Sequence, residues 1–427
     1  AGLALLPPDS WQTEYEFTLA LHVETVEVYY LNTRFEDAEQ LGAVVLQEAQ
    51  SLLERVKIYE LKIQSQYAQF QLQSVIETAL EILEPLGVVL PRTPTQEQIE
   101  AEENLIKELL GDRKIEDLAN LPEMTDPYQL AALRILLTVT SATIITDPLL
   151  CPLVTMVSVK FCIQNGNSPL AAGAYIFYAQ LLCGVLKNIE WGHQFCQLSL
   201  MLKDKMELGN LKALVIHYSI GIRHWKESFR DIPLEQMQEG IQVGIETGNF
   251  ENACYNAIDY CLYSIFGGYN LPEFYPKHEE YTRLTIKLKQ VYSVYYIESA
   301  KAIAANLLKE NLDNYGLIIG DSWEEEEQIL AAWLEGNALW LLFITYLSKT
   351  IAFSYLNQFD SALDAAQKAD LYGGSSAAYV VFPQHIFYYS LALVSVCQSE
   401  STPLKKAEFL NKARSNQELM KEWAKYA

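Results

Sequence analysis

A short motif that recurs at the start of helix-like stretches constrains the fold of this chain more than any other feature. In "YLNQFDSALDAAQKA" (355–369), a turn at Asn357 precedes Phe359, and a small residue, Ala362, follows three positions later. A helix that packs closely against the preceding helix needs a small side chain where the two axes approach. A large apolar residue at its start can fill the space at the turn. The motif therefore predicts the second helix of a tightly packed antiparallel pair.

The motif recurs at several points along the chain. The stronger matches pair Phe35 with Ala38, Ile189 with Gly192, Phe250 with Ala253 and Phe359 with Ala362, and the weaker ones pair Leu72 with Val75, Leu149 with Pro152 and Leu404 with Ala407. Strand-like alternation is scarce, and several prolines stand where helices would begin. The pattern predicts an all-α protein: a right-handed, tetratricopeptide-like α-solenoid of about ten antiparallel helix pairs, with about 70% helix or more. An irregular helical bundle with chance matches is the alternative.

The composition argues against some classes of function. The chain has 427 residues, half of them hydrophobic, and 54 acidic against 31 basic residues give a formal net charge of −23. A phosphate-binding surface needs clustered Lys and Arg, so nucleic acid is not an expected partner. The seven cysteines lie mostly in apolar stretches and form no CxxC pair. We therefore expect buried, reduced thiols in a cytoplasmic protein, and no metal site.

Two stretches interrupt the repeat pattern and divide the chain into expected sections. Residues 91–125 are rich in Glu and are expected to form an acidic connecting segment, and residues 309–323 are expected to form a loop. The helical repeats then form N-terminal (1–90), central (126–308) and C-terminal (324–427) sections of one continuous solenoid.

One uncharged stretch, the nineteen residues 168–186, has the length of a membrane span. It contains a Gln, a Pro and two Gly, and a charged amphipathic helix follows it at once. We therefore expect a helix buried between its neighbours and no association with a membrane.

Several phrases together resemble a known helical region. They are "LPEMTDPYQLAALRIL" (121–136), "IQNGNSPLAAGAYIFYAQLLCGVLKNIEWGHQF" (163–195), "VKIYELKIQSQYAQFQLQSVIETALEILEPLGV" (56–88), "IRHWKE" (222–227) and "KEWAKYA" at the end. Over nearly its whole length, the chain resembles the tetratricopeptide-like helical region of multidomain signalling kinases of the cyanobacterial type. In those proteins a serine/threonine-kinase-like domain and a predicted P-loop ATPase precede the helical array, and a GAF domain and a histidine kinase follow it.

The resemblance implies a segment from the middle of a longer protein, which would itself be an ATP-dependent serine/threonine kinase, histidine kinase or both. It implies no catalytic, cofactor-binding or metal-binding residue inside this region. The sequence contains no GxxxxGK[ST] phosphate loop, no HRD or DFG kinase motif, no HExxH and no GxSxG. We therefore expect no cofactor and no enzyme activity of the segment itself.

Three local features have both an ordinary and a functional interpretation. His217 and His224, seven residues apart, could form half of a metal site, but histidines satisfied within the fold are the simpler interpretation. The carboxylates of "WEEEE" (323–327) suit the first turn of a helix, with a cation site as the alternative. The 26 tyrosines are expected to fill gaps between helices, and some could line a groove for a peptide or a small ligand.

A basic stripe is the candidate partner-binding surface. A helix is expected around residues 212–230, with an apolar stripe at Leu214, Tyr218, Ile222, Trp225 and Phe229. Arg223, Lys226 and Arg230 fall three and four residues apart on a different face of this helix. The stripe is either a solvated helix face with local ion pairs or a surface that docks an acidic patch of a neighbouring domain or of another copy.

The favoured function is a non-catalytic regulatory or protein-interaction solenoid, which the resemblance places between the ATPase and the sensor and histidine-kinase parts of a signalling kinase. Its expected partners are other domains of the parent protein, or a protein or peptide. A helical array that senses a small-molecule ligand in its concave groove is the first alternative, and an all-α enzyme is the second. The sequence names neither the signal nor the partner.

Overall fold

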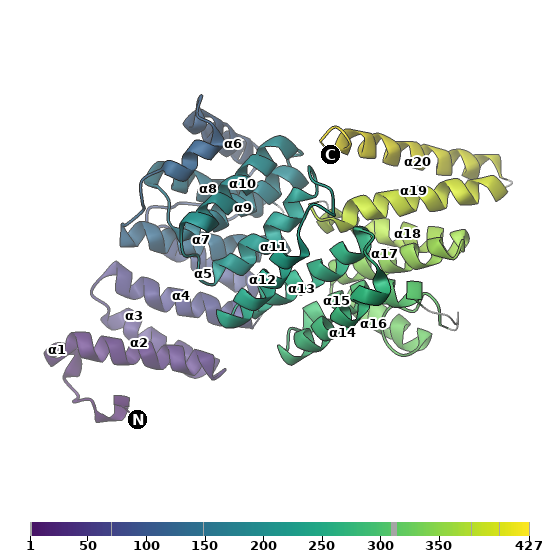
Figure 1. Cartoon of the computed structure of the whole chain (residues 1–427). Coiled ribbons are helices and arrows are strands. Elements are labelled where there is room, and N and C mark those ends of the chain that lie inside the picture. Colours follow the sequence, from purple (N-terminus) through teal and green to yellow (C-terminus); the bar gives the residue numbers. More distant parts are fainter. Residues whose placement is uncertain are drawn as a thin grey trace. The chain divides into compact units, whose positions relative to one another are not determined.

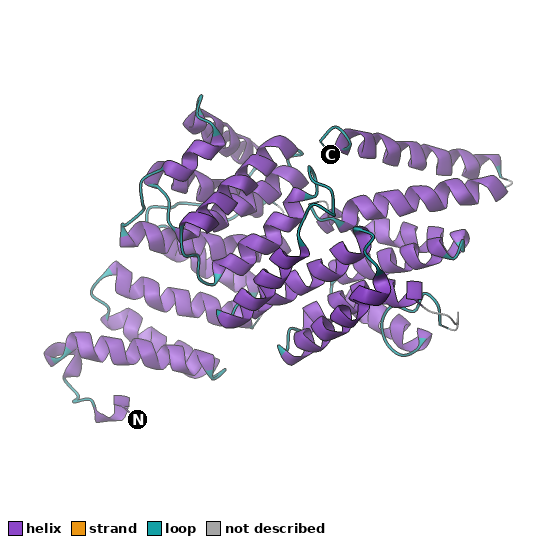
Figure 2. Ribbon diagram, viewed as in Figure 1, coloured by secondary structure: helices purple, strands orange, loops and turns teal. Residues whose placement is uncertain are grey.

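Helices form most of the structure (Figure 2). The computed structural model describes residues 2–69, 71–147, 149–308, 314–376, 378–400 and 402–426, and 78% of these residues are helical. Among them no strand occurs, although one isolated bridge joins Glu123 and Asn167. The prediction of an all-α protein built from neighbouring helix pairs, as in an α-solenoid, is confirmed.

The chain forms two compact units, and the first comprises residues 1–178. Its helices are α1 (Ser10–Thr13), α2 (Tyr15–Leu31), α3 (Phe35–Glu48), α4 (Leu52–Ala68), α5 (Leu72–Leu83), α6 (Gln96–Leu110), α7 (Pro127–Thr146), α8 (Leu150–Asn165) and the larger part of α9 (Pro169–Gly184), with the 3-10 helices η1 (Gly2–Leu5) and η2 (Ile115–Asn120) (Figure 1). Successive helices pack as neighbours, for example α2 on α3, α4 on α5 and α7 on α8. The expected connecting segment 91–125 contains α6 and η2.

The second unit comprises residues 179–427. Its helices are the end of α9, α10 (Ile189–Lys205), α11 (Leu211–Arg223), α12 (Leu234–Glu246), α13 (Phe250–Phe266), α14 (Leu271–Lys287), α15 (Val291–Leu308), α16 (Trp323–Glu335), α17 (Leu339–Tyr355), α18 (Phe359–Tyr372), α19 (Val381–Ser399) and α20 (Pro403–Trp423), with the 3-10 helix η3 (Gly373–Ser376). Helices α11, α13, α15, α17 and α19 pack on one another in turn, and α12, α14, α16, α18 and α20 each pack on a member of that row. The expected section boundaries within the chain stay a prediction.

A common turn joins many of the helices. In seven turns, one residue with positive φ stands two positions before the first residue of the next helix; these residues are Thr33, Lys187, Gly209, Gly248, Lys289, Asn337 and Asn357. In five of these turns, those at Thr33, Lys187, Lys289, Asn337 and Asn357, the following residue bonds back across the helix end, as when the Gln358 N–H donates to the Phe353 carbonyl at 2.9 Å. A left-handed residue followed by such a bond is the Schellman ending of a helix. The repeated motif of the sequence therefore marks a repeated turn, including the turn at Asn357.

The large residues of the four stronger motif matches open their helices. Phe35, Ile189, Phe250 and Phe359 are the first residues of α3, α10, α13 and α18. Ile189 is buried, whereas Phe250 is 39% exposed and fills the space at its turn only in part.

The small residues of the same matches lie where helices approach closely. Ala38, Ala253 and Ala362 are buried, and so is Gly192. A Cβ added to Gly192 would overlap Cys183 of α9, and one added to Gly244 would lie 2.8 Å from Ala253 Cβ. The weakest match was wrong, because Leu404 is 79% exposed and Ala407 is exposed as well. Both lie at the start of α20, where residues 402–408 are all exposed.

A buried polar network closes the loop that precedes α16. Glu326 Oε1 accepts the backbone N–H groups of Ile318 (2.9 Å) and Ile319 (3.2 Å), and its other oxygen pairs with Lys349 of α17. Lys349 also donates to the Gly316 carbonyl at 3.2 Å. Glu326 therefore forms a buried ion pair and also lies in the first turn of α16. Residues 309–313, the start of the expected loop, lie outside the described residues.

A second polar network, the Asn167 lock, lies in the first unit and consists of Leu118, Pro122, Met124, Asn167 and Tyr175. The Asn167 N–H donates to the Pro122 carbonyl (2.8 Å), and its C=O accepts from the Met124 N–H (2.7 Å). Its side chain donates to the Leu118 carbonyl (2.7 Å) and accepts from the Tyr175 hydroxyl (3.1 Å). The lock thus joins two distinctive phrases of the sequence, "LPEMTDPY" and "IQNGNSPL".

Gly166 makes this lock sterically possible. Its φ of 100° is unfavourable for other residues, and a Cβ at this position would overlap the Pro122 carbonyl oxygen. The chain can therefore pass this closely only with glycine here.

Candidate functional site

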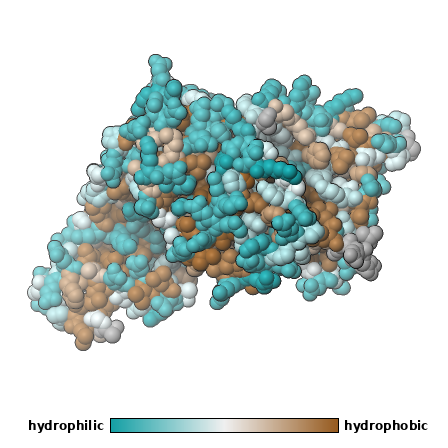
Figure 3. Space-filling view, in the orientation of Figure 1, coloured by the Kyte–Doolittle hydropathy of each residue, from teal (hydrophilic) through white to brown (hydrophobic). Residues whose placement is uncertain are grey.

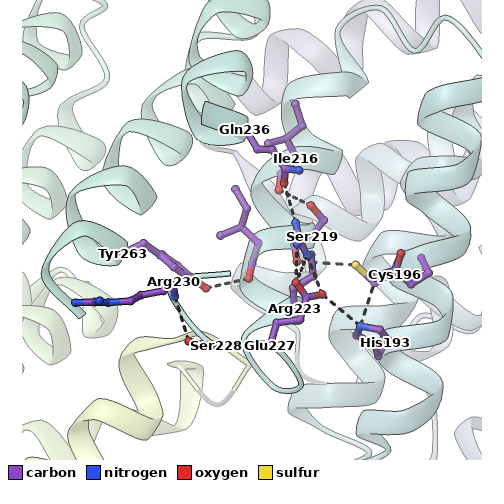
Figure 4. A network of polar contacts seen from close by, with 12 residues as sticks. His193, Cys196, Ile216, Ser219, Arg223, Glu227, Ser228, Arg230, Gln236 and Tyr263 are labelled. Carbon is purple, nitrogen blue, oxygen red and sulfur yellow. Dashed lines mark hydrogen bonds and ion pairs between the residues drawn. The ribbon is translucent and has the colours of Figure 1, made fainter. Parts of the chain in front are cut away.

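Helix α11 of the second unit has polar side chains on two sides and is the centre of the candidate site (Figure 4). It begins after the positive-φ residue Gly209 and ends at Arg223. The expectation of one helix over 212–230 was wrong, because turns follow Arg223 up to α12. Trp225 and Phe229 continue the apolar spacing, but these turns, not a helical face, place them against their neighbours. The spacing of the apolar residues alone could not distinguish a continued helix from a series of turns.

Arg223 is held from two directions. Its Nε lies 2.9 Å from both carboxylate oxygens of Glu227, and its Nη2 lies 2.6 Å from Glu227 Oε2. Its Nη1 donates to Gln236 Oε1 of α12 at 2.8 Å. The side chain is 12% exposed, so the guanidinium is fixed in a largely buried setting.

The carboxylate of Glu227 contacts two basic side chains. Burial opposes its ionisation, but Arg223 and His193 outweigh this effect and hold the pKa of its carboxyl below the ordinary value. His193 Nε2 of α10 lies 3.5 Å from Glu227 Oε1 (Figure 4). The segment after α11 is thereby tied back to α10, α11 and α12.

The three predicted basic residues do not form one stripe. Lys226 pairs with Glu190 of α10 at 2.7 Å. Arg230 donates to the Gly267 carbonyl (2.7 Å) and the Gly268 carbonyl (3.0 Å), beyond the end of α13. Each cation thus has acceptors on a different element, and only Arg230 is exposed as a whole residue. Their role in binding a partner stays a prediction.

A groove opens beside Arg223. It has a volume of about 260 Å³ and is lined from α10 by Gln197, Leu200, Lys203 and Asp204, from α11 by Ile216, Ser219 and Arg223, and from α12 by Gln236 and Glu239. Most of these side chains can form hydrogen bonds, and four of them are charged. The arrangement suits a small polar ligand better than an apolar one.

On its other side, α11 carries a buried histidine that pairs with an aspartate of α13. His217 Nδ1 lies 2.6 Å from Asp259 Oδ2 of α13, and its ring stacks on Tyr255 at a centroid distance of 5.1 Å. The cavity that remains here measures about 10 Å³, which is room for about one water molecule. This side of α11 is therefore packed, whereas the groove on its other side is open.

His224 lies just beyond α11 and does not act with His217. It is buried between aromatic rings, and burial lowers the pKa of its imidazole to about 3. Its Nε2 has no hydrogen-bond partner among the described residues. The described part of the chain also holds no group of three or more His, Cys, Asp or Glu side chains that could bind a metal ion.

The cysteines and the long apolar stretch match their ordinary interpretation in part. All seven cysteines are free, six of them are buried, and burial raises the pKa of Cys151 and of Cys254 to about 11. No helix in the described part of the chain is both long and apolar enough to cross a membrane. Hydrophilic side chains cover much of the visible face, with apolar patches between them (Figure 3).

Most residues of the site were not identified from the sequence, among them Glu190, Glu227, Gln236 and Asp259. Glu227 follows Arg223 by four positions, a spacing typical of an ion pair within one helix, and this signal was available. Asp259 lies 42 positions from His217. Such a pairing depends on how two helices pack, which a single sequence does not reveal.

Comparisons with known proteins point to signal transduction. No protein-family model matches the chain. An alignment of 291 residues, covering 64% of the chain, shows 19% identity to hybrid signal transduction histidine kinase G of Dictyostelium discoideum. The chain spans 8% of that protein's length. The chain is therefore similar to a small part of a signalling protein.

Proposed function

We propose that this chain is a non-catalytic regulatory segment of a multidomain signalling kinase. It would bind other domains of that protein, or a protein or peptide partner, and it would act in the cytoplasm without a cofactor. The observation that carries this proposal is the alignment with a hybrid histidine kinase, which covers 64% of the chain but only 8% of the kinase. A match of this extent is expected if one helical segment serves a much larger signalling protein.

The architecture supports a regulatory role in physical terms. Stacked helix pairs contact mainly their neighbours, so a bound partner can change the curvature of a stack through many small displacements. A segment of this kind can couple the parts on either side of it without performing chemistry. The resemblance would place an ATPase before the segment and a sensor with a histidine kinase after it.

The test uses the parent protein and its parts. Autophosphorylation of the full-length protein is compared with that of a variant whose residues 1–427 are replaced by a flexible linker, and association of this segment with the flanking domains is measured by calorimetry. We expect altered regulation and measurable association. Unchanged regulation together with no association would contradict the proposal, as would ATP hydrolysis by the purified segment.

A small-molecule sensor is the second candidate function. The groove of about 260 Å³ favours it, because charged and amide side chains from three helices converge there around a fixed guanidinium. A ligand-dependent rise in the melting temperature of the isolated segment would support this candidate. No shift with any polar metabolite would leave only the interaction role.

A further inference from the structure

The charges of the groove between α10, α11 and α12 differ in burial. The side chains of Arg223 and Lys203 are only 12% and 18% exposed, and we call these two cations the floor of the groove. The side chains of Glu239 and Asp204 are 42% and 73% exposed, and we call these two carboxylates its mouth. A ligand in this groove therefore meets positive charge on the more buried side chains and negative charge on the more exposed ones.

The arginine of the floor has N–H groups that no described protein group accepts. Arg223 carries five N–H groups. Its Nε–H is shared between both Glu227 oxygens, and its two terminal nitrogens each donate once, to Glu227 and to Gln236. One N–H on each terminal nitrogen is left for a ligand. Glu227 and Gln236 also fix the guanidinium plane, so a ligand does not have to order this side chain when it binds.

Lys203 adds a second source of charge. Its neighbour Asp204, at 2.8 Å, is strongly exposed, and such a pair contributes little in water. The ammonium group can therefore turn to a ligand at small cost. Together with Arg223 it forms a site with the charge and hydrogen-bond donors that a carboxylate requires.

The two carboxylates of the mouth favour a positively charged group on the outer end of a ligand. Glu239 pairs with Lys212 at 2.7 Å, yet it remains partly exposed and lines the groove. A cationic group on the outer end of a ligand would lie near Glu239 and Asp204. A second carboxylate at this end would be repelled by both.

We propose that the groove binds a small zwitterion, such as a free amino acid, with its carboxylate at Arg223 and Lys203 and its ammonium group toward Glu239 and Asp204. The volume of about 260 Å³ suits a molecule of this size. The proposal rests on the ligand-sensing function proposed above and specifies the ligand class.

Three probe sets test the assignment on the intact segment. Binding is measured by calorimetry and thermal shift with free amino acids, with their carboxamides and with the corresponding decarboxylated amines; succinate serves as a dianion. We expect at least one amino acid to bind, and its carboxamide, its amine and succinate to bind at least about tenfold more weakly.

One pair of variants locates the binding site. Lys203→Gln removes a floor cation, and we expect it to weaken amino-acid binding by about tenfold. Lys205→Gln is the control, because Lys205 is an exposed lysine on the same helix that does not line the groove. Both variants carry the same change of charge, and we expect the control to bind as tightly as the wild type.

Three results would overturn the proposal: no binding of any free amino acid, equal binding of the carboxamide, or unchanged binding by Lys203→Gln. None of these results bears on association with the flanking domains, which is a separate measurement. Failure of the zwitterion site is therefore distinguishable from failure of the regulatory function.

Discussion

The Asn167 lock of the first unit and the Arg223 groove of the second unit use polar side chains in opposite ways. In the lock, neutral groups bond to one another, and both main-chain groups and both ends of the Asn167 side chain have partners. At the groove the groups are charged, and Arg223, which lines a cavity of about 260 Å³, keeps unused donors. Satisfied neutral networks specify a structure, whereas charged groups with spare donors are available for a ligand. The first is therefore expected to control stability and the second binding.

The largest effect on stability is expected at Gly166. Gly166→Ala would place a Cβ against the Pro122 carbonyl oxygen and require a residue other than glycine at a φ of 100°. We expect a loss of about 4 kcal/mol or more in the free energy of unfolding, measured with urea. Gly87→Ala is the matched control, because φ is 86° there but no atom lies within 4 Å of the added Cβ. A similar loss in both variants would show that backbone conformation, and not the close approach, makes Gly166 necessary.

The next largest effect on stability is expected at low pH and concerns a histidine of the second unit. The folded pKa of His224, about 3, lies below its ordinary value of 6.5. The stability that this neutral histidine contributes is therefore complete above pH 6.5 and is lost as the pH falls toward 3. Between pH 6.5 and pH 4 the loss should be on the order of 3 kcal/mol. Acid titration followed by tryptophan fluorescence should show this slope.

The variant His224→Phe keeps an aromatic ring among Trp225 and Phe229 but cannot take up a proton. Its stability should depend less on pH over the same range. A pH dependence equal to that of the wild type would mean that His224 is not the group that titrates.

A smaller difference in stability is expected between a variant of the lock and a variant of the groove. Asn167→Ala leaves the buried Leu118 carbonyl and the Tyr175 hydroxyl without this partner, and we expect a cost of about 2 kcal/mol. Lys203→Gln loses only a pair with an exposed carboxylate, and we expect a cost within about 0.5 kcal/mol. Thermal unfolding of both variants measures the difference. If the groove variant lost as much stability as the lock variant, Lys203 would be a structural residue.

The turns between helices could be predicted well from the sequence, whereas the partners of polar side chains could not. Asn357, Phe359 and Ala362 lie within six residues of one another, and local geometry gives the equivalent residues of the three other stronger matches the same places at their turns. The contact of Gly166 with Pro122 joins residues that are far apart in sequence, although both phrases were recognised as distinctive. Its existence depends on how α7, α8 and the preceding loop pack.

The candidate site shows the same division. Arg223 was identified from its spacing, but the helix was expected to continue past it, because Trp225 and Phe229 maintain a helical period of apolar residues. The partner Gln236 comes from the next helix and depends on the turns between them. Local periodicity therefore finds a charged residue, and only packing shows whether it faces solvent, a carboxylate or a groove.

An effect on stability smaller than that of Asn167→Ala concerns Glu227. Its folded pKa lies below the ordinary value of 4.5, so its contribution is present above that pH and is lost as the pH falls through the folded pKa. Glu227→Gln should cost about 1 kcal/mol at pH 7 and less in acid, measured by urea unfolding at both pH values. His193 Nε2 lies 3.5 Å from the same carboxylate, so Glu227→Gln/His193→Gln is the control. A cost that does not fall in acid would show that the charge of Glu227 is not what stabilises this contact.

Hydrogen–deuterium exchange of the whole chain, with and without a mixture of free amino acids at millimolar concentration, tests most directly the claim that the groove binds and the lock only holds the fold. Both regions are read in one experiment and serve as controls for each other. The account predicts slower exchange in 197–204, 216–223 and 234–239 and no change in 118–124 or 165–175. Unchanged exchange in all these segments, or protection at the Asn167 lock without protection at the groove, would contradict it.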